Sequence, residues 1–314
     1  TMMHKILSNQ QNISGFARVG VPVDEGQHLI KEIIPNDQGC GGMMELGYSE
    51  KAHLTEKSEC ATQEIREKIL KKWNRHWDLS QDFLLEKTPA LNLLRTRFWN
   101  HLFPESYFII MTRHPIAYSY ALLRFEKKKP TLENIEKLLR HWIHCHKIYK
   151  NDAKKIQNLK EIRYEDFVLN PRQNLKQFFG FIGNSGGPII RNIIHRNTNK
   201  KYFNLWKKEK RENKLEVERL EQEFESEINL WRYSFDLSNP YFRPSRIKNF
   251  FTLTSTEKKI LSYIKKLLPS AENYPPKIVI LGPAKTGTTA MVSRVQQNIG
   301  RSYECFFEPY QLPN

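Results

Sequence analysis

Two short apolar runs, each stopped by a proline, are the clearest structural signals in the chain. They read "FLLEKTP" at 83–89 and "YFIIMTRHP" at 107–115. Runs of this kind are typical of buried parallel strands that end in loops. Between them, "NLLRTRFWNHLF" at 92–103 has apolar residues at helical spacing. The pattern therefore predicts strand, helix, strand and an α/β fold with a mostly parallel central sheet flanked by helices.

Other segments extend this alternation. "EIRYEDFVLNP" at 161–171 predicts a further strand and turn, "VPVDEGQHLI" at 21–30 predicts a loop, and "PPKIVILGP" at 275–283 predicts a short strand that leads into another loop. Thr131, or the residue before it, is placed to cap the long helix that follows. Helical spacing of apolar residues, or a charge-rich helical composition, predicts helices at 2–8, 59–79, 131–156, 172–183, 206–231 and 289–299.

Composition narrows the partners. The formal net charge of +16 favours anionic ligands, although much of the excess lies in solvated runs. No apolar run reaches the roughly 18 residues that a membrane span needs, and the basic runs carry no nucleic-acid motif. The four cysteines have no zinc-binding spacing, and the three histidines of "RHWIHCHK" are expected to be structural or solvated rather than metal ligands. The compartment stays open.

The stretch "LGPAKTGTTAMVSRVQQNI" at 281–299 predicts a phosphate-binding loop that runs into a helix. Gly282 and Gly287 let the backbone wrap closely around an anion, and Lys285 adds a positive charge. In the usual nucleoside-triphosphate loop the lysine follows the second glycine. Here it precedes that glycine, so a phosphate-containing nucleotide other than ATP or GTP is expected. A P-loop kinase of another type and a non-catalytic remnant are the alternatives.

The position of this lysine is typical of a known protein family. "PAKTGTT" at 283–289 resembles the 5′-phosphosulfate loop of sulfotransferases that use 3′-phosphoadenosine 5′-phosphosulfate (PAPS), and "MTRHPIAYSYA" resembles their 3′-phosphate motif. "LLEKTP" and "IRYEDFVLNP" are similar to segments of bacterial and tyrosylprotein sulfotransferases. The resemblance implies a three-layer P-loop-type sandwich that transfers a sulfuryl group from PAPS to a hydroxyl or amine, leaves 3′-phosphoadenosine 5′-phosphate (PAP), and requires no metal.

The resemblance also implies site residues. Lys87 and Lys285 would stabilise the charge on the transferring group, and Glu25 would take the acceptor proton, with Asp24 and His28 as alternatives. Arg113 would hold the 3′-phosphate. The family usually has a serine eight residues after this arginine, where this chain has Ala121, and Ser119 lies on a different side of a helix. The full set of predicted cofactor contacts is Pro283, Lys285, Thr286, Gly287, Thr288, Thr289, Arg113, Ser119 and Tyr164.

The order of these motifs is unusual, because a loop that normally opens the domain stands near position 285. We expect a sulfotransferase domain at 1–240 without its first strand and phosphate loop, a helical linker at 241–275, and a strand, loop and helix at 276–314. The last part either begins a second such domain, with Glu308 as the counterpart of Glu25, or completes the first one by permutation. In both cases residues 277–281 should fill the empty strand position and bring Lys285 opposite Arg113. The segments 2–8 and 289–299 would then compete for one helix position. The acceptor can be a small molecule, a carbohydrate, a lipid or a peptide, and the oligomeric state is left open.

Overall fold

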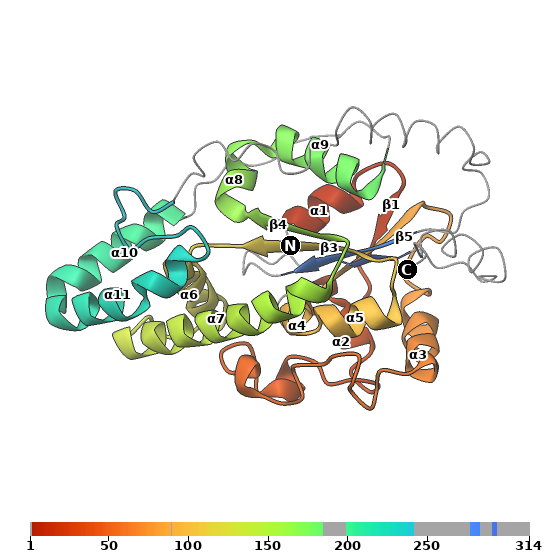
Figure 1. Ribbon diagram of the computed structural model, residues 1–314, viewed down its shortest axis with the longest axis horizontal. Coiled ribbons are helices and arrows are strands. Elements are labelled where there is room, and N and C mark those ends of the chain that lie inside the picture. Colours follow the sequence, from red (N-terminus) through yellow and green to blue (C-terminus); the bar gives the residue numbers. More distant parts are fainter. Residues whose placement is uncertain (1, 89, 185–198, 242–276, 283–290, 294–314) are drawn as a thin grey trace, which may run out of the picture.

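The computed structural model describes residues 2–88, 90–184, 199–241, 277–282 and 291–293 of the 314-residue chain. The predicted α/β class is confirmed, because these residues form a central, mostly parallel sheet with helices on both faces (Figure 1). The strand order is β1-β2-β6-β5-β3-β4, with an additional pairing between β2 and β5. The strands are β1 (Ile13–Gly15), β2 (Phe83–Lys87), β3 (Tyr107–Thr112), β4 (Leu159–Arg163), β5 (Lys277–Gly282) and β6 (Met291–Ser293).

Strand β5 lies between β2 and β3 and pairs in parallel with both. Lys87 of β2 is in register with Leu281, and Ile110 of β3 is in register with Gly282. This is the strand position that we expected residues 277–281 to fill. Since parallel strands end at the same edge of a sheet, the last residues of β2, β3 and β5 share one edge.

Residues 291–293 correct one prediction. We expected a helix at 289–299, but Met291–Ser293 form β6, which pairs antiparallel with both β2 and β5. A β-branched valine between apolar and small residues suits a strand as well as a helix, so pairing partners decide its conformation. The helix at 2–8 is present as α1. We expected residues 2–8 and 289–299 to compete for one helix position. Residues 291–293 do not take part in such a competition, because they form a strand.

The helices cover the two faces of the sheet (Figure 1). On one face lie α1, α8 and α9, and on the other lie α2 to α7, with α10 and α11 at one end of the molecule. Their bounds are α1 (Met2–Ser8), α2 (Gly26–Leu29), α3 (Gln63–Trp73), α4 (Leu91–Leu94), α5 (Thr96–Leu102), α6 (Pro115–Phe125), α7 (Leu132–Asp152), α8 (Tyr164–Leu169), α9 (Pro171–Ile182), α10 (Asn199–Glu212) and α11 (Lys214–Asn229).

Alternation along the strands explains these layers. Leu85 of β2 and Ile109 of β3 pack with α1, α8 and α9, whereas Leu84 and Phe108 pack with α3 and α5 on the opposite face. Successive strand residues point to opposite faces, so a strand that is apolar throughout needs a helical layer on each side. The apolar runs therefore specify a three-layer sandwich.

Two predicted helices are each broken in two. The segment 92–103 forms α4 and α5, which meet at Arg95, and the segment 206–231 falls on α10 and α11, which meet at Asn213. The buried Arg95 donates hydrogen bonds from Nε to Ala52 O (3.1 Å) and from Nη2 to Lys51 O (3.0 Å). This long-range pairing is invisible in a local pattern. Asn213 leaves the helical region at φ −129° and ψ 55°, and α10 and α11 then pack against each other.

Other boundaries also differ from the predictions. Thr131 caps α7 as expected, because its hydroxyl accepts a hydrogen bond from Asn134 N. The segment 161–171 is more helical than predicted, since β4 ends at Arg163 and α8 begins at once at Tyr164. Strand β1 and helix α2 were not predicted. Helix α2 lies in the segment 21–30, for which the pattern indicated a loop, and β1 lies just before it.

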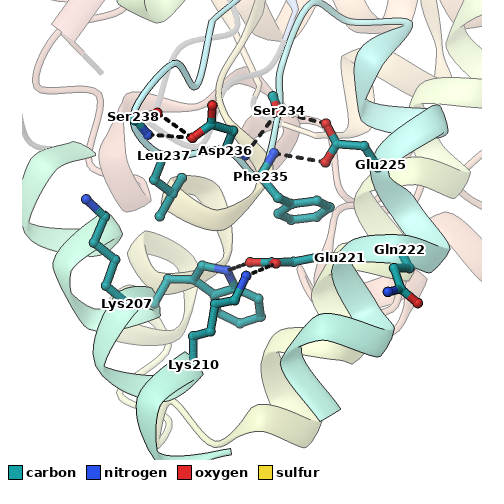
Figure 2. A pocket seen from close by; sticks show the side chains of 11 residues that line it. Lys207, Lys210, Glu221, Gln222, Glu225, Ser234, Phe235, Asp236, Leu237 and Ser238 are labelled. Atoms are coloured by element: carbon teal, nitrogen blue, oxygen red, sulfur yellow. Dashed lines mark hydrogen bonds and ion pairs between the residues drawn. The ribbon is translucent and has the colours of Figure 1, made fainter. Parts of the chain in front are cut away.

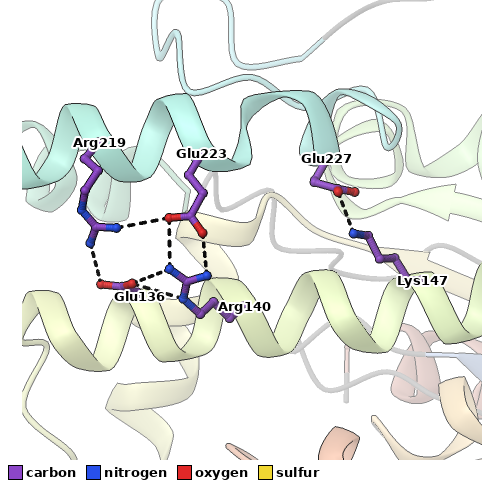
Figure 3. A network of polar contacts seen from close by, with 6 residues as sticks. All are labelled: Glu136, Arg140, Lys147, Arg219, Glu223 and Glu227. Atoms are coloured by element: carbon purple, nitrogen blue, oxygen red, sulfur yellow. Dashed lines mark hydrogen bonds and ion pairs between the residues drawn. The ribbon is translucent and has the colours of Figure 1, made fainter.

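Charged side chains join α11 to α7 (Figure 3). Arg140 lies between Glu136 and Glu223, and Arg219 contacts the same two carboxylates. One turn beyond Glu223 on α11, Glu227 pairs with Lys147 of α7 at 2.6 Å. These groups are partly exposed, so each pair contributes little, about 0–1 kcal/mol, and the buried apolar face of α11 does most to fix this helix. The predicted linker at 241–275 lies, except for Tyr241, outside the described residues.

Candidate functional site

A buried ion pair lies where β2 ends. Lys87 Nζ is 3.0 Å from Glu25 Oε1, and the two side chains are 0% and 8% exposed. The ammonium also donates to Val23 O at 2.7 Å. An ammonium has three N–H donors. These two bonds leave one donor that no described residue is seen to use. The structure thus brings together two of the predicted catalytic residues, which are 62 positions apart in the sequence.

The loop that carries Glu25 is tightly held. Gln27 donates from Nε2 to Glu25 Oε2 (2.7 Å), and its backbone N–H donates to Thr88 Oγ1 (3.2 Å). Val23 and Asp24 have positive φ values of 50° and 52°, which non-glycine residues rarely adopt. Strain of this kind persists only where the surroundings fix it, so the position of Glu25 is strongly determined.

The two alternatives to Glu25 have other partners. Asp24 Oδ1 accepts a hydrogen bond from Val19 N at 3.0 Å, across the turn. His28 Nδ1 lies 3.4 Å from Asn36 Nδ2. Of the three candidate bases, Glu25 is therefore the one whose side chain contacts Lys87.

The α1 helix adds a buried histidine to this region that the sequence patterns did not single out. Burial, with the nearby positive charge of Lys87, lowers the pKa of His4 to about 3. His4 is therefore neutral near pH 7. Its Nε2 lies 3.5 Å from Ser8 Oγ, one helical turn further along. A histidine close to a lysine can be recognised only once the fold places α1 beside β2.

A second buried cation follows β3. Arg113 is 3% exposed and donates from Nε to Asn199 Oδ1 at 2.9 Å. Its guanidinium lies 4.8 Å from the ring centre of Tyr164 and 5.5 Å from that of Tyr202. Burial lowers the pKa of Arg113, but only from a value far above neutrality, so the group stays charged. The aromatic contacts orient the planar guanidinium.

Glu165 organises the surroundings of Arg113. It accepts hydrogen bonds from His114 N (3.0 Å), Asn199 Nδ2 (2.7 Å) and Tyr233 OH (3.1 Å). Burial is the main influence on its pKa and raises it. Asn199 and Tyr233 lie far from Arg113 in the sequence and in no motif, which is why sequence reasoning missed them. Tyr164, which was predicted, is buried at the start of α8.

Ser119 lies in α6 and is fully buried. Its Oγ has no hydrogen-bond partner among the described residues. A buried hydroxyl without a partner is unfavourable by about 1–3 kcal/mol, so its presence calls for an explanation. The other predicted cofactor contacts, residues 283 and 285–289, lie outside the described residues, as does Glu308.

A wide groove of about 640 Å³ lies between α10, α11 and residues 234–238 (Figure 2). Both glutamates shown with hydrogen bonds there are already engaged: Glu221 contacts Lys210 and accepts from Trp206 Nε1, and Glu225 accepts from Ser234 Oγ and Phe235 N. None of the residues that line it is a predicted site residue.

The histidines of α7 have structural partners, as expected. His141 Nε2 accepts from Gly47 N at 2.9 Å, and His144 Nε2 lies 3.0 Å from Gly47 O. His146 Nδ1 contacts Trp142 O at 2.7 Å. Across the described parts of the chain, no group of three or more His, Cys, Asp or Glu side chains is arranged to hold a metal ion, and no helix there is long and apolar enough to cross a membrane.

Comparison with known protein families identifies a match to this chain. A family model described as the sulfotransferase family matches residues 1–185, more than half of the chain. No curated protein and no solved structure matches the chain. The matched range contains Glu25, Lys87, Arg113 and Tyr164, so the resemblance seen in their motifs is confirmed at the level of the family.

Proposed function

The chain belongs to the sulfotransferase family, and from this premise we propose that it transfers the sulfuryl group of PAPS to a hydroxyl or amine of an acceptor. The observation that carries the proposal is the buried Glu25–Lys87 pair at the carboxyl end of β2. Parallel α/β sheets bind their ligands at this edge. A desolvated carboxylate next to a desolvated ammonium combines a proton acceptor with a stabiliser of negative charge.

In the proposed reaction, an acceptor oxygen or nitrogen attacks the sulfur of PAPS and forms a new S–O or S–N bond. The bond between sulfur and the bridging phosphate oxygen breaks, and that oxygen leaves with the electron pair on PAP. Glu25 takes the acceptor proton. Lys87 keeps its charge and donates a hydrogen bond from its third N–H to a sulfuryl or bridging oxygen, where negative charge develops. By analogy with phosphoryl transfer, positioning and electrostatics supply most of the rate enhancement.

Arg113 is proposed to hold the 3′-phosphate. A guanidinium can donate two parallel hydrogen bonds to a phosphate, and the rings of Tyr164 and Tyr202 favour one orientation of that fork. Tyr164 is proposed to lie near the adenosine. A phosphate oxygen or a hydroxyl of the ligand would also give the unpaired Ser119 Oγ a partner, which supports its inclusion in the site.

The 5′-phosphosulfate is proposed to bind residues 283–289, with Lys285 adding a second positive charge to that of Lys87. Support comes from β5, which pairs with β2 and β3 and ends at Gly282, at the sheet edge that carries Lys87 and Arg113. We therefore propose that residues 276–314 complete the domain formed by residues 1–240, with 241–275 as the linker. The acceptor class stays as broad as the family implies: a small molecule, a carbohydrate, a lipid or a peptide.

Calorimetric binding of PAP, in parallel with ATP and magnesium, tests the donor. We expect PAP to bind, and we expect Lys285→Ala and Arg113→Ala to abolish that binding. Arg124→Ala is the matched control, because Arg124 is an exposed arginine on α6 for which no contact with Glu25, Lys87 or Arg113 is seen in the described part of the chain. Transfer of radiolabelled sulfuryl from PAPS to pools of carbohydrates, lipids and tyrosine peptides then identifies the acceptor class.

Other outcomes of these binding and transfer experiments would contradict the proposal in different ways. Preference for ATP with magnesium would replace the proposal by a kinase. Binding of neither nucleotide would show that residues 283–289 do not complete this site. Binding of PAP without transfer in any pool, although Glu25 and Lys87 are intact, would identify a non-catalytic remnant.

A further inference from the structure

Three consecutive residues at the end of β2 hold three consecutive residues of the Glu25 loop. Lys87 pairs with Glu25, Thr88 Oγ1 accepts the N–H of Gln27, and Glu86 packs against Gly26 between them. The first contact belongs to the proposed chemistry. The third involves a carboxyl that no step of that chemistry uses.

Glu86 is 1% exposed, and both of its oxygens accept hydrogen bonds. Thr88 Oγ1 donates to Oε1, and Asn92 Nδ2 donates to Oε2 at 2.8 Å. Asn92 is fixed in turn by Trp99, whose Nε1 donates to Asn92 Oδ1 at 2.8 Å. The carboxyl is therefore held in one orientation by groups on β2, α4 and α5.

Gly26 has no room to move toward this carboxyl. A Cβ on Gly26 would lie 2.6 Å from Glu86 Oε1, which is closer than real Cβ contacts. The carbonyl of Gly26 is also held, because Trp73 Nε1 donates to Gly26 O at 3.1 Å. Gly26, the residue next to Glu25, is thus held by contacts with both Glu86 and Trp73.

The charge of Glu86 is also coupled to the ion pair. Burial raises the pKa of Glu86 to about 7, the hydrogen bonds from Thr88 and Asn92 oppose this, and the charges of Glu25 and Lys87 act in opposite directions. Among the residues that the structure describes, Glu25 and Lys87 are the charged groups that act on it. Glu86 therefore changes its charge near neutrality, one residue away from Lys87.

We propose that Glu86 is a positioning residue of the sulfuryl-transfer site, whose carboxyl holds Gly26, and with it Glu25, against Lys87. The inference rests on the proposed function of the Glu25–Lys87 pair. When Glu86 ionises, a second carboxylate lies beside Lys87 and weakens the positive charge available to the transferring group. The rate of transfer is therefore lower on the alkaline side of the Glu86 titration.

Glu86→Ala and Glu86→Gln separate positioning from charge. Because a misplacement of about 1 Å can lower a rate by about 10²-fold, we expect Glu86→Ala to lower kcat by about that factor, with KM for PAPS and Kd for PAP nearly unchanged. Glu86→Gln keeps the shape, so its kcat should stay within about tenfold of wild type while the inflection near pH 7 disappears from the pH profile. Asp152→Asn is the matched control: it removes a buried carboxylate that contacts His53 and Arg97 and should leave both kcat and the profile unchanged.

An unchanged kcat in Glu86→Ala, or a parallel loss of PAP affinity, would overturn the inference. If Glu86→Ala does not fold, Glu86→Gln decides, and an inflection that persists in it would overturn the inference equally. A crystal structure of Glu86→Ala and an infrared titration of wild type and Glu86→Gln need no turnover. We expect the Glu25–Lys87 distance to lengthen beyond 3.0 Å in the first, and a carboxyl that titrates near pH 7 to be lost in the second. Failure of wild type to use PAPS would refute the proposed function. An unchanged Glu25–Lys87 distance in Glu86→Ala, or a carboxyl titration near pH 7 that persists in Glu86→Gln, would instead refute the role of Glu86.

Discussion

The buried Glu25–Lys87 pair allows a quantitative test in a double-mutant cycle of Lys87→Met, Glu25→Gln and the combined variant. At an N–O distance of 3.0 Å and an effective dielectric constant of about 20, the attraction between the two charges is about 5.5 kcal/mol. The loss of water from both groups offsets much of this gain. Removing one partner leaves the other charge buried without compensation, which typically lowers the free energy of unfolding by about 3–5 kcal/mol.

The combined variant should behave differently from either single variant. With both charges removed, neither group remains uncompensated, and replacing a buried ion pair by neutral groups is often close to neutral. We therefore expect each single variant to lose about 3–5 kcal/mol and the combined variant to lose less than the sum, by about 3 kcal/mol or more. Urea unfolding followed by circular dichroism measures all four proteins, with the slope of the transition checked for constancy.

The exposed pair Lys147–Glu227 provides the comparison within the same protein. Its N–O distance of 2.6 Å is shorter, but the side chains are 57% and 29% exposed (Figure 3). The corresponding cycle should give a coupling of about 0–1 kcal/mol. Additive losses at Glu25 and Lys87, or single losses as small as those of the exposed pair, would refute the view that this site is desolvated.

Three further predictions follow from contacts described above. Arg113→Lys keeps the charge but loses the planar fork and the contacts with Tyr164 and Tyr202, so calorimetry should show PAP affinity reduced by roughly 10- to 100-fold; equal affinity would contradict the assignment of Arg113 to the 3′-phosphate. The pKa of Glu86 is raised from the ordinary value of 4.5 to about 7 in the folded protein. Its contribution to the free energy of unfolding is therefore fully present below pH 4.5 and is lost as the pH rises through 7. Unfolding experiments across this range should show a decrease of about 3 kcal/mol in wild type that is absent from Glu86→Gln, and the same slope in both would exclude Glu86 as its source. Gly47→Ala would place a Cβ 2.4 Å from Cys145 Sγ and should lower stability by about 1–3 kcal/mol in thermal unfolding without changing PAP affinity; no change in stability would show that the loop at Gly47 yields easily.

Local patterns predicted the parts of the fold that depend on them. The apolar runs before Lys87 and Arg113 are long enough to identify buried strands, and a parallel arrangement places their last residues at one edge. The three residues of β1 are too few to show a period, so this strand was missed. In 291–293 the residues suit either conformation, and pairing with β2 and β5 gives a strand.

The site was predictable only where it follows a motif. The candidates Glu25 and Lys87 came from family motifs, but their direct contact comes from a loop that turns at two positive φ values. Asn199 contacts Arg113 across 86 positions, and no local signal could identify such a partner. Glu86 was hidden for another reason: it lies in a run of apolar residues that reads as a buried strand, where a carboxyl is not expected.

The position of β5 has a consequence for how the protein reaches its native state. Tyr107 pairs with Val279, so the contact that joins β3 to β5 closes a very long loop of chain. During synthesis β2 and β3 emerge well before β5, and their facing edges have no strand to pair with until residue 282 has been made. Contacts so distant in sequence slow folding, and unpaired apolar strands promote aggregation in the meantime. The central pairings of this sheet are therefore expected to form only after residue 282 has emerged, and the unpaired edges of β2 and β3 are open to aggregation until then.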